Sequence, residues 1–267
     1  MKQPNYFRYF FKKFSFDIFY PRLGVVYMVL PMNRLSIYIA FERHYLIYII
    51  YVSLAHILLV WRVITSMFNS NIVTMKNSLK GTLTEENLLK AFAGESQARN
   101  RYNFFASQAK KDGYEQIAAI FDLTADQERE HAKRFFKYLE GGMATIHNAS
   151  YPAGIISTTE HNLVAAAAGE HEEWEVLYAS FAETAHAEGF QKIALTFKHV
   201  AEVEKEHERR YLKLLSRLTD GDFFRRDGEI VWQCRNCGYI VKASMAPKLC
   251  PSCEHEQRFF EPMADNY

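Results

Sequence analysis

The feature that most limits how this 267-residue chain can fold is an internal repeat. The stretch 112–139 resembles the stretch 188–215 when the two are laid side by side without gaps. Identical residues recur at matching places, namely Gly113 with Gly189, Ile117 with Ile193, Phe121 with Phe197, Glu128 with Glu204, and His131 with His207. Both copies lack proline and are rich in helix-forming residues. The repeat therefore predicts two similar helical hairpins that close into one four-helix bundle with approximate twofold symmetry.

The breaks in this pattern give the expected helix boundaries. The sequence predicts four helices, at 84–111, 114–140, 159–187 and 190–217. Thr84 is the expected N-cap of the first of them, because a threonine side chain can accept a hydrogen bond from a free backbone N–H group. The two turns within the hairpins are short and contain glycine. The segment between the hairpins is long enough to carry the chain along the length of the bundle.

The spacing between the two copies is shorter by one residue near the beginning of the repeat. There, Ala93-Gly94-Glu95 matches Ala168-Gly169-Glu170. One helix must therefore contain one extra residue. A local bulge in the helix can absorb such a residue, so we expect an irregular turn.

A carboxylate and an imidazole occur three residues apart in both copies of the repeat. Glu128 precedes His131 and Glu204 precedes His207, and residues at this spacing are neighbours on a helix surface. A single Glu-x-x-His in such charged helices usually marks a solvent-exposed face. Two copies at equivalent places are more informative, because the other two helices each carry one glutamate in an Ala-rich apolar stretch, Glu95 and Glu170.

A metal pair explains these six residues together. A glutamate on an apolar face needs a cationic partner, because an isolated buried carboxylate is too costly to keep ionised. One Glu from each of two helices and one Glu-x-x-His from each of the other two form the ligand set of di-iron helical bundles. Carboxylate oxygens with one imidazole per metal favour iron or manganese.

Three further residues lie close to this set in the sequence. Glu173 follows Glu170 by one helical turn and is a seventh ligand candidate, although a surface charge is the alternative. Its counterpart in the first hairpin is an alanine, so the site is expected to be asymmetric. Tyr102 and Tyr178 can form hydrogen bonds near the metals, and packing in the core is an equally good interpretation. Other acidic residues are assigned to solvated faces: Glu130, Glu172, Glu202, Glu206 and Glu208.

The last part of the chain contains all four cysteines, as two Cys-x-x-Cys pairs: Cys234, Cys237, Cys250 and Cys253. Four thiolates at this spacing predict a closed tetrahedral site for iron or zinc. Zinc is the ordinary structural choice. Iron fits better beside a di-iron centre, because an iron site can pass single electrons and zinc cannot. Nearby aromatic residues can cover the site with apolar surface: Trp232, Tyr239, Phe259 and Phe260.

Residues 1–74 differ from the rest in composition. They hold eight basic and two acidic side chains, whereas residues 75–267 hold 24 basic and 29 acidic ones. The acidic excess of the larger part argues against nucleic-acid binding. The apolar run 46–61 is short for a membrane span and has arginines on both sides, and a signal peptide fits less well. A start of the native protein at Met75 is the interpretation we prefer.

The motifs from residue 75 onward resemble those of the rubrerythrin family. The resemblance rests on GESQARNRY at 94–102, EREH at 128–131, GEHEEWEVLY at 169–178, EKEH at 204–207, and CRNCGY with CPSCEH. It implies a mainly α protein, with a ferritin-like di-iron four-helix bundle at 75–220 and a small rubredoxin-like four-cysteine β-ribbon domain at 228–267. It also implies three irons per chain, with Glu128 and Glu204 bridging two of them and Glu173 exchanging with His131 as the redox state changes.

The same resemblance implies a function. Members of the family are cytoplasmic peroxidases that reduce hydrogen peroxide to water in defence against oxidative stress, and they form homodimers. The chain lacks a glycine-rich dinucleotide motif, so a separate NAD(P)H-dependent rubredoxin or ferredoxin reductase, or a rubredoxin, is the expected electron donor. A ferritin-like iron oxidase or store and a structural zinc-ribbon protein are the alternatives.

Overall fold

The structure is a computed structural model. It describes residues 78–266, the helical residues 57–65 and, by their backbone alone, four strands between residues 7 and 42. The chain divides into two compact units, Met1–Lys76 and Asn77–Tyr267. Of the apolar run 46–61, only residues 57–61 lie in the described part. No helix among the described residues is both long and apolar enough to cross a bilayer.

The first unit contains a four-stranded antiparallel sheet in which neighbouring strands are consecutive in sequence. Its strands are β1 (Phe7–Phe11), β2 (Phe14–Phe19), β3 (Val25–Met32) and β4 (Leu35–Glu42). The helical turns at 57–65 follow, and their apolar side chains are exposed. The remaining expectations for residues 1–74 fall outside the described residues.

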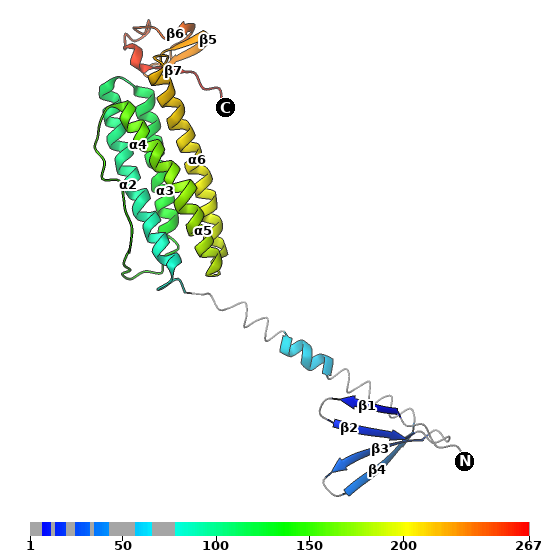
Figure 1. Cartoon of the computed structure of the whole chain (residues 1–267). Coiled ribbons are helices and arrows are strands. Elements are labelled where there is room, and N and C mark those ends of the chain that lie inside the picture. The colour runs from blue at the N-terminus through cyan, green and yellow to red at the C-terminus, as the bar shows by residue number, and fades with distance from the viewer. Residues whose placement is uncertain are drawn as a thin grey trace. The chain divides into compact units, whose positions relative to one another are not determined.

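The second unit consists of a four-helix bundle followed by a small sheet (Figure 1). The bundle helices are α2 (Leu83–Asp112), α3 (Glu115–Phe136), α4 (Thr159–Glu172) with α5 (Tyr178–Ala187), and α6 (Gln191–Thr219). The segment after α3 runs along the outside of the bundle to the start of α4 (Figure 1). These helices confirm the predicted bundle, and α3 ends earlier than expected, at Phe136.

The extra residue of the repeat forms the predicted bulge. Between α4 and α5 the chain forms one π-helical turn, η1 (Glu173–Leu177). This turn lies between Glu170 and Tyr178, where the spacing between the two copies of the repeat lengthens by one residue. The wide turn therefore restores the register of the repeat.

The first bundle helix, α2, begins at Leu83, and its N-cap lies two residues before the predicted one. Thr82 is the N-cap of α2, and its side chain accepts a hydrogen bond from the N–H of Glu85. The prediction for Thr84 was wrong, because its hydroxyl is buried and donates to the carboxylate of Glu188 at 2.6 Å. Threonines two residues apart are hard to distinguish from sequence alone, because both precede the same apolar pattern.

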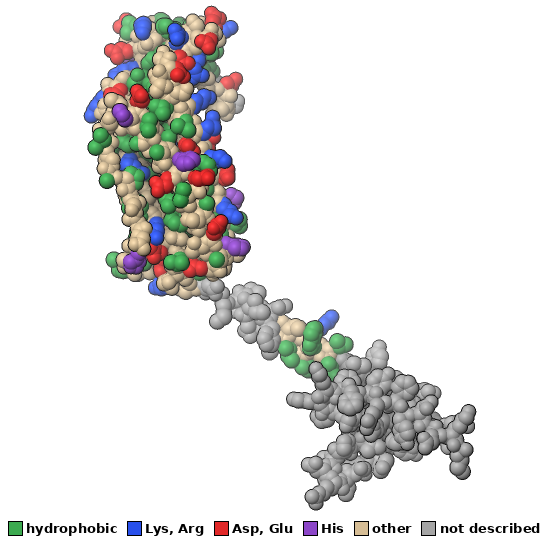
Figure 2. Space-filling model, in the orientation of Figure 1, with side chains coloured by type: hydrophobic (Ala, Val, Ile, Leu, Met, Phe, Trp, Pro, Cys, Tyr) green, Lys and Arg blue, Asp and Glu red, His purple; other side chains and the backbone are tan. Residues whose placement is uncertain are grey.

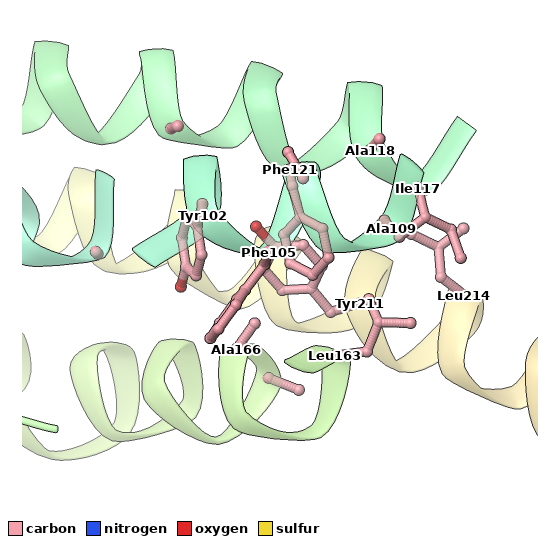
Figure 3. Close-up of a cluster of buried hydrophobic side chains, with 14 of the residues drawn as sticks. Tyr102, Phe105, Ala109, Ile117, Ala118, Phe121, Leu163, Ala166, Tyr211 and Leu214 are labelled. Atoms are coloured by element: carbon pink, nitrogen blue, oxygen red, sulfur yellow. The ribbon is translucent and has the colours of Figure 1, made fainter. Parts of the chain in front are cut away.

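Two aromatic clusters fill the bundle and have equivalent members. The first contains Tyr102, Phe105 and Phe121, and Figure 3 shows these side chains packed between the helices. The second contains their repeat equivalents, Tyr178, Phe181 and Phe197. On the face of the bundle seen in Figure 2, acidic and basic side chains are interspersed.

The C-terminal sheet has the strand order β6-β5-β7, with β5 (Arg225–Cys234), β6 (Ile240–Met245) and β7 (Phe260–Pro262). It follows directly from the end of α6 (Figure 1). A 3-10 turn, η2 (Gln257–Phe259), precedes β7. All neighbouring strands are antiparallel.

Candidate metal centres

Four glutamates from four helices meet inside the bundle. Glu95 lies on α2, Glu128 on α3, Glu170 on α4 and Glu204 on α6, and each side chain is 0% exposed. The repeat accounts for this arrangement, because equivalent positions of two similar hairpins face one another across the approximate twofold axis. Four buried carboxylates in one place require compensating positive charge.

Two histidines direct their Nδ1 atoms at these carboxylates. His131 Nδ1 lies 2.9 Å from an oxygen of Glu204 and 3.1 Å from one of Glu128. His207 Nδ1 lies 2.8 Å and 3.1 Å from the other oxygens of the same two glutamates. The donor atoms form two overlapping sets within 4.8 Å, namely Glu95, Glu128, His131 and Glu204, and Glu128, Glu170, Glu204 and His207.

The electrostatics of the cluster favour a bound cation. Burial, together with the charge of Glu128, raises the pKa of Glu170 to about 8. Burial also raises the pKa of Glu95 well above its usual range. Burial lowers the pKa of His207, but three close carboxylates outweigh that effect and raise it to about 12. Without metal, protons must therefore supply the positive charge that the cluster needs.

Several buried donor atoms of the cluster have ion-pair contacts but no well-formed hydrogen bond, among them Glu95 Oε2, Glu170 Oε2, both oxygens of Glu204, and His207 Nδ1. Leaving a buried polar atom unpaired is costly. Binding of two metals would satisfy these atoms, and the mixture of carboxylate and imidazole donors suits iron. The residues present therefore fit a di-iron centre.

Tyr102 and Tyr178 link the two halves of the cluster. The Tyr102 hydroxyl donates to Glu170 Oε1 at 2.5 Å, and the Tyr178 hydroxyl donates to Glu95 Oε1 at 2.5 Å. Each tyrosine thus holds the glutamate of the opposite hairpin. The sequence left open whether these tyrosines pack in the core or form hydrogen bonds near the metals. Both are observed, because the rings pack in the two aromatic clusters and the hydroxyls donate to the metal-site glutamates.

Glu173 lies beside the cluster but belongs to neither set of donor atoms. It is the first residue of the π turn, and its Oε1 lies 3.8 Å from the point where a Cβ on Gly94 would be. Burial, followed by the charge of Glu95, raises the pKa of Glu173 well above its usual range. A cavity of about 290 Å³ adjoins Glu173, and its walls include Gly94, Tyr151 and Tyr178.

The structure shows supporting residues that the sequence pattern did not single out. Trp174 Nε1 donates to Glu208 Oε2 at 2.6 Å, which ties the π turn to α6. Glu208 is therefore a partner of the turn and not only a surface charge. Gln127 accepts a hydrogen bond from His207. A glutamine beside a ligand glutamate carries no recognisable signal in one sequence.

The four cysteines come together at one end of the C-terminal sheet. Cys234 Sγ lies 3.8 Å from Cys253 Sγ, and Cys237 Sγ lies 3.6 Å from Cys250 Sγ. All four sulfur atoms lie within 4.8 Å of one another and form no disulfide. A backbone hydrogen bond from His255 lowers the pKa of Cys253 to about 6, which favours the thiolate form that binds metal.

Apolar side chains cover this cysteine cluster as expected. Trp232 and Phe260 are fully buried beside Cys234 and Cys250, and Tyr239 and Phe259 pack against them. The C-terminal sheet and its four cysteines together form a small module, which also contacts the bundle. Arg258 Nη1 donates to the carbonyl of Lys110 at 3.2 Å and lies 3.9 Å from Glu115 Oε1. The module therefore rests on the α2–α3 turn.

Comparisons with known proteins agree with both centres. The family model for rubrerythrin matches residues 86–215, and the model for the rubredoxin-like domain of rubrerythrin matches residues 232–261. Rubrerythrin of Porphyromonas gingivalis is 64% identical over 193 residues, which cover 72% of this chain and 96% of that protein. Rubrerythrin of Nitratidesulfovibrio vulgaris is 54% identical over 190 residues, covering 71% and 99%. Rubrerythrin-1 of Clostridium acetobutylicum is 54% identical over 194 residues, covering 71% and 99%.

These matches identify the two clusters of donor atoms. The carboxylate and histidine cluster corresponds to a di-iron centre, and the four-cysteine cluster corresponds to a rubredoxin-like iron site. The fold is accordingly a ferritin-like bundle with a small rubredoxin-like sheet. The chain belongs to the rubrerythrin family.

Proposed function

We propose that this protein is a non-haem di-iron peroxidase that reduces hydrogen peroxide to water. Residues 75–220 would form the di-iron domain and residues 228–267 the rubredoxin-like domain. The observation that carries the proposal is the overlap of the two sets of donor atoms, which share Glu128 and Glu204. Carboxylates that both metals share would hold the metals side by side. Peroxide takes up two electrons when it is reduced, and a pair of neighbouring irons can supply one electron each.

Each residue of the cluster has a place in this proposal. Glu128 and Glu204 would be shared by the two irons, Glu95 and His131 would hold one of them, and Glu170 and His207 would hold the other. When bound, the iron pair supplies electrons in pairs and polarises the oxygen atoms of a bound peroxide. Tyr102 and Tyr178 keep Glu170 and Glu95 in place, because each hydroxyl donates to one oxygen and leaves the other free.

Glu173 serves two purposes in the proposed cycle. It would exchange with His131 as a ligand of the same iron when the redox state changes. In the arrangement seen in the structure, His131 lies within the cluster and Glu173 lies beside it, at the edge of the cavity. Reduction of one peroxide to two water molecules consumes two electrons and two protons, so an acidic side chain at this cavity is well placed to pass protons to the site.

Electrons reach the di-iron centre through the rubredoxin-like iron in this proposal. An NAD(P)H-dependent rubredoxin or ferredoxin reductase, or a rubredoxin, supplies them one at a time. We further propose a cytoplasmic homodimer that acts in defence against oxidative stress. The contact of the module with the α2–α3 turn supports a relay within one assembly, because the module is docked and not merely tethered.

Metal analysis with an optical spectrum tests this function. We expect about three irons per chain, and a visible thiolate-to-iron absorption that reductant bleaches and peroxide restores. Glu128→Ala and Glu204→Ala should abolish peroxide turnover and leave that absorption unchanged. The exposed Glu202, near Glu204 on α6, provides the matched control, Glu202→Ala. Zinc in the cysteine site with no metal in the bundle, or full turnover in Glu128→Ala, would disprove the proposal.

A further inference from the structure

His207 is held from outside the cluster by a glutamine whose orientation is fixed. His207 Nε2 lies 3.0 Å from Gln127 Oε1. The same oxygen accepts a hydrogen bond from Arg210 Nη2 at 3.4 Å, and Arg210 Nη2 also donates to Thr124 Oγ1 at 2.6 Å. An arginine can only donate hydrogen bonds. The amide atom that faces it must therefore be the oxygen, which settles an orientation that is otherwise ambiguous.

This orientation fixes the tautomer of His207. The oxygen of Gln127 can only accept, so Nε2 of His207 must carry the hydrogen. The lone pair of the neutral imidazole is then on Nδ1, which lies 2.8 Å from Glu204 and 3.1 Å from Glu128. Arg210 and Gln127 together present the Nδ1 lone pair to a metal in the cluster.

The other half of the repeat lacks this support. The alignment that pairs Glu128 with Glu204 places Val203 where Gln127 would be and Arg134 where Arg210 would be. Val203 cannot accept a hydrogen bond, and Arg134 Nη2 donates instead to the Tyr138 hydroxyl at 2.6 Å. In the described part of the chain, no residue makes a hydrogen bond to Nε2 of His131. The His131 side chain is also more exposed, at 15% against 2% for His207.

We propose that Gln127, oriented by Arg210, is a positioning residue that makes His207 the permanent imidazole ligand of the metal pair. The missing counterpart at Val203 leaves His131 as the imidazole that can leave its metal. Although Glu173 belongs to the second hairpin, its side chain lies on the same side of the metal cluster as His131, because it adjoins Gly94 and Glu95 on α2. The exchange of Glu173 with His131 rests on the proposed function. The support of His207 by Gln127 does not, and it can be measured in a protein loaded with zinc.

The first test compares Gln127→Leu with Gln127→Glu in the full-length protein loaded with zinc. Gln127→Leu removes the acceptor, whereas Gln127→Glu keeps an oxygen that can accept from His207 and pair with Arg210. We expect Gln127→Leu to weaken one of the two bundle metals about 10- to 100-fold in chelator competition. Exchange of the His207 Nε2 proton with water, followed by NMR, should become as fast as that of His131. Gln127→Glu should restore both properties.

The second test installs the missing support. Val203→Gln should slow exchange of the His131 Nε2 proton with water and raise the affinity for the bundle metal on the His131 side. Val203→Leu is the matched control and should change neither property. The inference would be overturned if Gln127→Leu bound both metals as tightly as wild type and its His207 Nε2 proton still exchanged slowly with water. Equal weakening in Gln127→Leu and Gln127→Glu would overturn it as well. If instead the wild type and all the variants show the expected rates of proton exchange with water but none of them reduces peroxide, the proposed function fails and this inference stands.

Discussion

Two glycines at equivalent positions of the repeat differ in what surrounds them. Gly94 and Gly169 both lie inside helices, with Glu95 and Glu170 as the next residues. A Cβ on Gly94 would lie 3.8 Å from Glu173 and 3.9 Å from Tyr151, whereas a Cβ on Gly169 would meet nothing within 4 Å. Both glycines line the cavity beside Glu173, but only at Gly94 would an added Cβ contact the Glu173 side chain.

This difference leads to a prediction at the residue level. Gly94→Ala and Gly169→Ala should each stabilise the protein by about 0.5–1 kcal/mol, because alanine is the better helix former. Only Gly94→Ala should slow the change of the di-iron spectrum on oxidation by peroxide, because its methyl group touches Glu173. Thermal unfolding and stopped-flow absorption measure the two effects. Equal oxidation rates in both variants would contradict a movement of Glu173.

The tyrosine pair offers a second comparison at the same level. Tyr102→Phe and Tyr178→Phe each remove a hydrogen bond to a buried carboxylate, an interaction worth roughly 1.5–3 kcal/mol. We expect both variants to lose iron faster than wild type during dialysis against a chelator. Peroxide that enters through the cavity beside Glu173 would pass Tyr178 and not Tyr102, so only Tyr178→Phe should also change the peroxide concentration at half-maximal turnover. A KM shift of equal size in Tyr102→Phe would show that the cavity is not the peroxide entrance.

At the level of these residues, the sequence could predict the features that occur in both copies of the repeat. Glu128 with His131 and Glu204 with His207 recur at one spacing, and that recurrence separates ligands from surface charges. The support of His207 by Gln127 occurs once, and its partner position holds a valine. Such a contact depends on which side chain of a neighbouring helix lies opposite, and a periodic pattern on one helix does not contain that information.

At the level of helices, two carboxylates fasten the hairpins to each other at opposite ends. Asp112, the last residue of α2, accepts hydrogen bonds from the backbone N–H and the hydroxyl of Thr159 at the start of α4. Glu188, which follows α5, accepts the same two bonds from Thr84 at the start of α2. Each carboxylate satisfies free N–H groups and the positive end of a helix dipole.

These contacts predict how stability depends on pH. Burial tends to raise the pKa of Asp112 and of Glu188, but hydrogen bonds from Thr159 and Thr84 outweigh it, so both pKa values are lowered. A lowered pKa in the folded state gives stabilisation that is complete above the unfolded pKa, about 4, and is lost as pH falls through the folded value. Asp112→Asn and Glu188→Gln should each cost about 1 kcal/mol at pH 7, because hydrogen bonds to a charged group are stronger than those to a neutral amide by about that amount, and the cost should be less in strong acid.

Thermal unfolding of these two variants at neutral and acidic pH checks the expected difference. The matched control is Glu160→Gln, because Glu160 lies in the first turn of α4 and is exposed. Its effect should be smaller at every pH. A loss of stability in Glu188→Gln that grows as the pH falls would contradict the assignment of these carboxylates as caps.

The π turn shows how far a repeat can specify an element. One extra residue between Glu170 and Tyr178 required an irregularity somewhere in that helix, and the turn at Glu173–Leu177 is the result. Which five residues widen depends on tertiary contacts such as the Trp174 bond to Glu208. The turn allows Tyr178 to reach Glu95 as Tyr102 reaches Glu170, although the two tyrosines stand eight and seven residues after their helix's glutamate.

For the whole molecule, the position of the rubredoxin-like module raises the question of the electron path. Tyr114 packs edge-on against Phe223 at 5.3 Å, and Arg258 lies 3.9 Å from Glu115. The module thus rests at the start of α3. Glu128 lies thirteen positions after Glu115 on α3, about 20 Å along the axis at the rise of an α-helix. Electron transfer slows steeply with distance, so the module of a second copy is the better donor if it docks nearer.

Mixed dimers can decide between transfer within a chain and transfer between chains. Glu128→Ala removes the di-iron centre, and Cys237→Ser removes the rubredoxin-like iron, so each homodimer should be inactive. If electrons cross between chains, a dimer of these two variants contains one complete path, from the intact module of one chain to the intact bundle of the other. A dimer of wild type with a chain carrying both changes contains none. Turnover should therefore appear in the first mixture and be absent from the second, after isolation through two different affinity tags. Transfer within a chain predicts the reverse, because only the second mixture then keeps both centres in one polypeptide.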